Sequence, residues 1–196
     1  MRTRGAAWAA VLFGGGLLAA AAGCQAADAP AGGDQAPAPA PAKASRAVAV
    51  LEGRSGSKLE GQAVFTRGAD GRIGFRVEVR NVTPGLHAIH IHEHPDCGDP
   101  AAKNAGGHWN PTSKNHGKWG QADGQFHLGD LGNIEVAADG RGVLEVETDL
   151  WTLGDGGTVD VVGRSIIVHG GADDFTTQPT GNAGDRIGCG PIVAEK

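Results

Sequence analysis

From residue 46 onward, short stretches of the chain alternate between apolar and polar residues with a period of two. The clearest example is 73–79, where Ile73, Phe75, Val77 and Val79 are separated by glycine or charged residues. Successive side chains of a β-strand point to opposite faces, so this period predicts a strand with one buried face. Alternation also occurs at Val48/Val50, at Ala63/Phe65 and over 143–146, and Ser165 to His169 is predicted as a short apolar strand.

Turn signals separate these stretches, and no stretch has the period of an amphipathic helix. The turns are marked by Asp70-Gly71, Thr83-Pro84-Gly85, Asp139-Gly140 and Asp155-Gly156. Many short strands with glycine-rich turns are typical of an all-β sandwich or barrel. Two segments, 93–131 and 170–188, are long, polar and rich in glycine, and loops of that length in a compact domain are usually functional.

The N-terminal part has a different composition. Residues 1–23 have a basic start, an apolar run and a small-residue end, which predicts a secretory signal. The end Ala21-Ala22-Gly23-Cys24 resembles a bacterial lipoprotein signal in which Cys24 is acylated, although that family usually has Leu where Ala21 stands. The alternative is ordinary cleavage after an Ala-x-Ala step, which leaves Cys24 as a spare thiol.

The remainder divides into a linker and one domain. Residues 24–45 are rich in alanine and proline and are predicted to form an extended spacer. Residues 46–196, about 150 in number, suffice for one domain. Removal of the signal takes away two arginines and no acid, leaving 15 basic and 22 acidic side chains and a net charge of −7. Without a basic run, the chain is not expected to bind nucleic acid.

Histidines are crowded between Gly85 and Cys97. His87, His90, His92 and His94 fall within eight residues. Neutral imidazole is the commonest protein ligand for transition metals, so the crowding predicts a metal site. In a strand, His90 and His92 point to the same face and can bind one ion, whereas His87 points to the other face.

The first long segment supplies a second set of ligands. Three imidazoles and one carboxylate, spaced His108-x7-His116-x10-His127-x2-Asp130, form a closed set that suits tetrahedral zinc. With His90, His92 and His169, the chain has one ligand too few for two four-coordinate sites. A histidine shared between two ions removes this deficit, because a deprotonated imidazole has two nitrogens.

The three cysteines allow two interpretations. If Cys24 carries lipid, Cys97 and Cys189 remain as the one available disulfide of an exported protein. The alternative makes Cys97 a soft metal ligand beside the histidines, although no second cysteine lies at ligand spacing.

Four separated motifs resemble copper/zinc superoxide dismutase of the exported bacterial kind. They occur in the order of that family, and the resemblance extends from Arg46 to Val193. The fold it implies is an eight-stranded Greek-key β-barrel, a flattened sandwich with two long functional loops. The motifs are His87-x2-His90-x-His92, Gly107-His108-Trp109-Asn110-Pro111, His127-Leu-Gly-Asp-Leu-Gly-Asn133 and Gly181-Asn-Ala-Gly-Asp-Arg-Ile-Gly-Cys189-Gly.

The resemblance also implies two metal sites and the roles of their neighbours. Copper would be bound by His90, His92, His108 and His169, and zinc by His108, His116, His127 and Asp130, with His108 as the bridge. Arg186 would lie beside the copper, Asp173 would link ligands of both metals, and His87 would brace the copper strand without binding metal. Cys97 and Cys189 would form the disulfide.

Two positions depart from the family pattern, and the acidic charge raises a question about the substrate. His94 is interpreted as a surface histidine after the strand, with a weak extra copper site as the alternative. Trp109 is expected to pack as a ring where the family often has Tyr or Phe. Lys103, Lys114 and Lys118 in the metal loop are candidates for attracting an anion, with surface solubility as the alternative.

The function implied is disproportionation of superoxide to O2 and H2O2 in the periplasm or cell envelope, which would protect the envelope, with lipid at Cys24 as the membrane contact. The sequence leaves monomer and homodimer open. A non-catalytic copper-binding protein is a rival, but it could do without Arg186 and a complete zinc set. A structural envelope domain is another rival, but it would not need eight histidines.

Overall fold

The computed structural model describes residues 43–195. The predicted signal at 1–23, the predicted acylation of Cys24 and residues 24–42 of the predicted linker lie outside the described residues. The elements are β1 (Arg46–Gly53), β2 (Glu60–Arg67), β3 (Ile73–Arg80), β4 (Gly85–His92), a 3-10 helix η1 (Lys103–Ala105), β5 (Asp130–Val136), β6 (Gly142–Thr148), β7 (Ser165–His169), β8 (Arg186–Pro191) and β9 (Val193–Ala194).

The strands form one closed antiparallel barrel. Their order is β2-β3-β6-β5-β4-β7-β8-β1, and pairing of β1 with β2 closes the ring. Strand β9 continues β8 beyond Ile192 and pairs with β1. The connections from β3 to β4 and from β6 to β7 pass over neighbouring strands, which is the Greek-key arrangement. The predicted eight-stranded all-β barrel is therefore confirmed.

Large apolar side chains fill one part of the barrel interior. Phe65 on β2, Phe75 on β3 and Trp151 are almost fully buried, with ring centroids 4.9–6.2 Å apart. The indole nitrogen of Trp151 donates to the carbonyl of Leu128, 3.0 Å away. Trp151 belongs to the connection between β6 and β7, which was not predicted as a distinct feature and contributes Leu153 and other side chains to the core.

Strand β1 buries its alanines rather than its valines. Ala47, Ala49 and Leu51 face the core, whereas Val50 is 58% exposed. The period of two thus predicts the strand correctly, but residue size alone does not identify its buried face.

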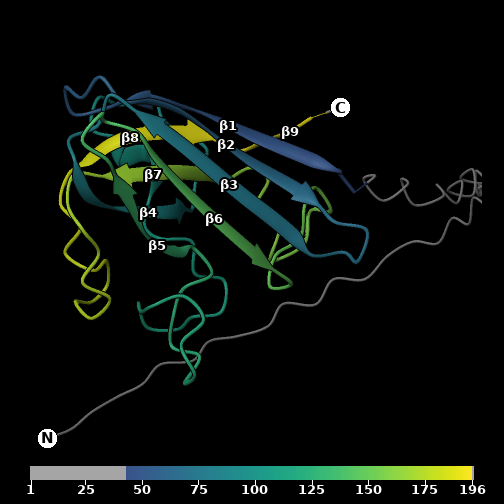
Figure 1. The fold of residues 1–196 in the computed structure, drawn as a ribbon. Helices are drawn as coiled ribbons and strands as arrows, with labels where there is room; N and C mark the ends of the chain where they lie inside the picture. Colours follow the sequence, from purple (N-terminus) through teal and green to yellow (C-terminus); the bar gives the residue numbers. More distant parts are fainter. Residues whose placement is uncertain (1–42, 196) are drawn as a thin grey trace, which may run out of the picture. The chain divides into compact units, whose positions relative to one another are not determined.

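Strands β4 and β7 are buried on both faces along the part that carries histidines. From His87 to His92 every residue of β4 is buried, as is all of β7. The two long connections, 93–129 and 170–185, extend from the half of the barrel formed by β4, β5, β7 and β8 (Figure 1). The predicted segments, 93–131 and 170–188, extend too far at their C-terminal ends, because Asp130 already belongs to β5 and Arg186 to β8.

Within residues 43–195, no helix is of the length and apolarity that crossing a membrane requires.

Candidate metal centre

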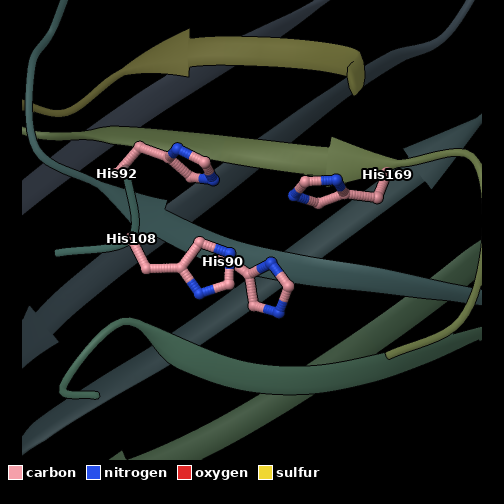
Figure 2. Close-up of side chains that lie close together, drawn as sticks. All are labelled: His90, His92, His108 and His169. Carbon is pink, nitrogen blue, oxygen red and sulfur yellow. The ribbon is translucent and has the colours of Figure 1, made fainter. Parts of the chain in front are cut away.

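Four histidines from three segments come together at β4 and β7. His90 and His92 lie on β4, His169 ends β7, and His108 comes from the long connection after β4 (Figure 2). A β-bridge between His92 and His108 ties that connection to the strand. The ring centroid of His90 lies 3.9 Å from that of His108 and 4.8 Å from that of His169.

Two bulges in the sheet lie at these histidines. The register of β4 against β5 shifts between Ile89 and His90, and that of β7 against β8 shifts between Val168 and His169. A bulge bends its strand and changes the direction of a side chain, and bulges are frequent beside active sites. The irregular register therefore helps to aim His90 and His169 toward each other.

One nitrogen of each ring is already used. His90 Nε2 lies 2.9 Å from Asp173 Oδ2, and His108 Nδ1 lies 2.9 Å from Asp130 Oδ1. His92 Nδ1 lies 3.1 Å from the carbonyl oxygen of Gly106, and His169 Nδ1 lies 3.3 Å from that of Gly184. These acceptors place the ring proton on the bonded nitrogen and leave a lone pair on the other.

The four remaining nitrogens are buried and have no hydrogen-bond partner. They are His90 Nδ1, His92 Nε2, His108 Nε2 and His169 Nε2. One ligand atom from each of these residues can be chosen so that all lie within 4.8 Å of one another. Converging lone pairs without a donor are costly when buried, and a metal cation is the group that satisfies them. The residues present therefore fit a four-nitrogen metal site.

The electrostatics keep these imidazoles neutral. Burial lowers the pKa of His90, and it lowers those of His92 and His169 well below their usual value. For His108, burial lowers the pKa to about 4 despite the nearby carboxylate of Asp130. A neutral ring has the free lone pair that a metal needs.

A second group surrounds Asp130 at the start of β5. The Nδ1 atoms of His108, His116 and His127 lie 2.9, 3.0 and 3.1 Å from its carboxylate oxygens. His116 Nδ1 lies at this distance without the geometry of a hydrogen bond and is otherwise unpartnered. One imidazole, that of His108, belongs to both groups. Three imidazoles and one carboxylate match the donor set of a structural zinc site.

The carboxylate of Asp130 is strongly held in its charged form. Burial alone would raise its pKa, but the three imidazoles and the backbone N–H of His127 keep it far below the usual range. Its Oδ2 accepts hydrogen bonds from the backbone N–H groups of Gly117 (3.1 Å) and His127 (2.8 Å). The negative charge is thus fixed in position before any cation binds.

Asp173 connects the two groups. Its two oxygens lie 2.9 Å from His90 Nε2 and 2.9 Å from His116 Nε2. Burial acts to raise the pKa of Asp173, but hydrogen bonds from both imidazoles and from the backbone of Phe175 hold it well below its usual range. Burial also acts to lower the pKa of His116, yet the carboxylates of Asp130 and Asp173 raise it to about 9.

Arg186 lies beside the first group. Its guanidinium donates to the carbonyl oxygens of Ala102 and Gly106, both at 2.7 Å. The Gly106 oxygen also accepts from His92 Nδ1, so one peptide oxygen separates the guanidinium from that imidazole. Its positive charge contributes to the low pKa of His92 and His169, after burial and neighbouring rings.

A disulfide holds the segment that positions Arg186. Cys97 and Cys189 are bonded, with Cα atoms 5.7 Å apart and a sequence separation of 92. The alternative role of Cys97 as a metal ligand is therefore wrong. Arg54 adds a second tie, because its Nε donates to the carbonyl oxygen of Cys97 at 2.9 Å.

The other histidines lie outside both groups. His87 is buried, with Nδ1 2.8 Å from the carbonyl oxygen of His169 and Nε2 2.8 Å from that of Thr83. His94 is exposed after the end of β4, and only its backbone N–H is engaged, with Ala105. Among the described residues, neither belongs to a group that could hold a metal.

The structure also places the three lysines that were predicted to attract an anion, and Trp109. Lys103 begins η1, next to Ala102, whose carbonyl holds Arg186, and Lys118 Nζ lies 5.9 Å from the ring centre of Phe175. Lys114 accepts a side-chain hydrogen bond from Asn110 at its carbonyl. The ring of Trp109 is buried, as expected, and Arg164 lies over it.

Three residues that hold the site were not predicted from the sequence. Arg54 and Gln178 bind backbone groups of distant segments, and no local motif marks them. Asn133 pairs with the backbone of Asp173 and stands at the end of the motif His127 to Asn133, where its side chain could have been noticed.

Comparison with known proteins points to one family. Residues 59–192 match the family described as "Copper/zinc superoxide dismutase (SODC)". A "Superoxide dismutase [Cu-Zn]" of Deinococcus radiodurans is 41% identical over 148 residues, covering 70% of this chain and 79% of its own length. The corresponding protein of Caulobacter vibrioides is 39% identical over 144 residues, covering 71% and 82%.

An "Extracellular superoxide dismutase [Cu-Zn]" of Onchocerca volvulus is 39% identical over 159 residues and covers 76% of each chain. Among solved structures, one titled "Crystal Structure Analysis of the clock protein EA4" matches with a TM-score of 0.69 and 31% identity. It covers 79% of this chain and 97% of its own.

Proposed function

This chain belongs to the copper/zinc superoxide dismutase family, an enzyme family that uses copper and zinc, and we propose which of its residues carry the activity. His90, His92, His108 and His169 bind copper. His108, His116, His127 and Asp130 bind zinc. The observation that carries the assignment is the convergence of four buried, unpartnered imidazole nitrogens, with His108 shared by both groups.

The reaction converts two superoxide anions and two protons into O2 and H2O2. Bound copper supplies the one-electron chemistry by alternating between two oxidation states, and zinc supplies a fixed positive charge. The protein has to admit a small anion, hold it beside the copper ligands and deliver protons. Each task is assigned to residues of this chain below.

Arg186 docks the anion. Its guanidinium is always charged, and its two carbonyl contacts fix it beside His92. Burial lowers its pKa, but not into the range in which arginine loses its proton at physiological pH. A charge in this position attracts superoxide without contributing a metal ligand, so it acts on substrate rather than on metal content.

His108 moves a proton at Nε2. Its Nδ1 is fixed on the side of Asp130, while Nε2 faces His90 and His92 and has no protein partner. Since it has no protein partner, Nε2 would accept one proton and pass it to the reduced substrate, and solvent would supply the second proton. The fixed second nitrogen keeps the ring in the same place through both states.

Lys103 assists approach of the anion despite the acidic charge of the domain. At physiological salt the Debye length is about 8 Å, so charges close to the copper side dominate those across the barrel. Lys103 lies within the same short 3-10 turn region that holds the guanidinium of Arg186. Lys118 lies over Phe175 instead, between the two long connections.

We further propose that the protein is exported and anchored in the cell envelope, where it removes superoxide. The disulfide and the extracellular relative support export. The anchor is lipid on Cys24, after removal of residues 1–23. Mass spectrometry of protein exported from its native host should find an acylated N-terminal Cys24, and a mature chain with another start would refute the anchor.

The experiment that tests the function combines metal content with a dismutation assay on the full chain. We expect about one copper and one zinc per chain and rapid superoxide removal, which is lost when copper is withdrawn and restored when it returns. Binding of both metals without dismutation would identify a copper-binding protein on this scaffold and refute the catalytic proposal.

A further inference from the structure

The side chain of Gln178 pairs with the main chain of His116. Its Oε1 accepts from the backbone N–H of His116 at 2.8 Å, and its Nε2 donates to the backbone carbonyl of the same residue at 2.8 Å. A carboxamide has one acceptor and one donor side, so it can bind both polar groups of a residue as an adjacent strand does. The two residues are 62 positions apart in the sequence.

A second carboxamide in the site pairs in the same way with the backbone of a residue that contacts His116. The carboxamide of Asn133 accepts from the backbone N–H of Asp173 at 2.7 Å and donates to its carbonyl at 3.0 Å. Asp173 in turn binds the imidazole of His116 through Oδ1. Asn133 therefore fixes the backbone of the residue that orients the ring, and Gln178 fixes the backbone of the ring itself.

His116 depends on such contacts because it lies in an irregular segment. No strand or helix includes it, and the connection between β4 and β5 runs for 37 residues, 93–129. Within the described residues, the hydrogen bonds to the backbone of His116 both come from Gln178. The segment carrying Gln178 also packs tightly here, since a Cβ at Gly181 would lie 2.6 Å from His116 Nε2.

We propose that Gln178 is a positioning residue for zinc: it fixes the backbone of His116 so that Nδ1 faces the zinc site. This inference rests on the proposal above that His116 binds zinc. The ring then has two independent supports, Asp173 at Nε2 and Gln178 at the backbone. Support at one end alone leaves the Cα free to move, and with it the direction of Nδ1.

The effect should be moderate, because Gln178 is exposed and water can replace part of what its amide does. Residues that orient metal ligands from outside change metal affinity by about 10–100-fold when removed. We expect Gln178→Met, which keeps the length but removes both hydrogen bonds, to weaken zinc by about tenfold. Gln178→Glu keeps the acceptor and loses the donor, so its zinc affinity should lie between that of Gln178→Met and that of the unchanged protein.

Gln121→Met is the matched control. Gln121 lies in the same connection as His116, and its carboxamide donates to a backbone carbonyl, that of Gln125, which is not a residue of the zinc group. The same chemical change therefore removes a similar contact without touching a proposed ligand. Both variants are prepared as the full, copper-loaded chain.

The measurements are zinc affinity by competition with a chelator and the visible spectrum of Co2+ in the zinc site. The cobalt bands report the geometry of the ligands in the zinc site. A general loosening of the fold does not shift these bands as a displaced ligand does. Gln178→Met should weaken zinc and shift the cobalt bands while copper affinity stays the same. Gln121→Met should leave the cobalt bands unchanged.

His116→Ala separates the two levels of the proposal. If His116→Ala binds zinc and cobalt as the unchanged protein does, the zinc assignment fails and the role of Gln178 fails with it. If His116→Ala loses zinc but Gln178→Met behaves like the unchanged protein, only the role of Gln178 is overturned. Equal effects of Gln178→Met and Gln121→Met would overturn it as well.

Discussion

The two halves of the barrel consist of the same kind of antiparallel strand but differ in how many faces of their strands are buried. In the half with β1, β2, β3 and β6, one face is buried and the other is exposed to solvent, as the regular alternation of β3 shows. In the half with β4, β5, β7 and β8, the histidine-bearing parts of β4 and β7 are buried on both faces. Figure 1 shows the two long connections on this second half.

The outer faces of the two halves differ accordingly. On the first half, arginine and glutamate form pairs between strands, such as Arg76 with Glu145 at 2.8 Å, and water covers them. On the second half, histidines occupy positions that would otherwise be apolar, and their polar atoms bind carboxylates and carbonyls of the connections. An antiparallel strand without an exposed face therefore indicates that something other than solvent covers it.

The largest effect should follow from His108→Ala. His108 is the one residue in both metal groups, so its loss removes a nitrogen from each. We expect copper and zinc to weaken together and dismutation to fall to background, with the barrel still folded because the aromatic core lies in the other half. Metal analysis, the dismutation assay and near-ultraviolet circular dichroism measure the three outcomes. Loss of zinc alone would contradict the shared role.

For the second half, the types and spacing of the ligand residues predicted more than the alternation of apolar and polar residues did. The spacing of His90 and His92 on one strand face and the count of seven ligand residues indicated two linked sites, and the structure brings those residues together. The same reasoning could not identify Gln178 or Arg54. Their partners are backbone groups, which carry no residue-specific signal, and they become neighbours only when distant segments fold together.

The first half was predicted by the alternation of apolar and polar residues. The alternation over 73–79 matches β3 residue by residue, with Ile73, Phe75 and Val77 inside. In β1 the two valines, Val48 and Val50, lie on the outer face, and the inner face is occupied by alanines and Leu51. Local hydrophobicity cannot show how much room the opposite wall of the barrel leaves.

Phe75→Ala should give the largest loss of stability in the first half. Its ring is 2% exposed and contacts Phe65 and Trp151, so the substitution leaves a cavity costing about 3–5 kcal/mol. Denaturant unfolding of the metal-free protein measures this cost. Val50→Ala is the control, since Val50 is 58% exposed and its loss should change stability by less than about 0.5 kcal/mol. Activity per bound copper should stay unchanged in both variants.

Arg186→Ala should separate catalysis from metal binding within the second half. The guanidinium contacts backbone carbonyls rather than metal ligands, so metal content should remain near normal. We expect kcat/KM to fall by about 10–100-fold, because a hydrogen bond between charged groups that docks the anion is lost. Arg186→Lys should recover part of it, because it restores the charge without the two-carbonyl contact. Unchanged kcat/KM in Arg186→Ala would refute the docking role.

The smallest effect should come from the charged outer face of the first half. Arg76 pairs with Glu145 and Glu78, all three side chains are well exposed, and solvent screens their attraction. We expect Arg76→Ala to shift Tm by no more than about 2 °C and to leave activity per copper unchanged. Glu145→Ala and the double variant complete a cycle that measures the coupling directly. A Tm loss above about 5 °C in Arg76→Ala would show that this face stabilises the barrel as strongly as buried contacts do. The distinction between a solvent-covered half and a loop-covered half would then no longer explain where the stability and the function of the barrel reside.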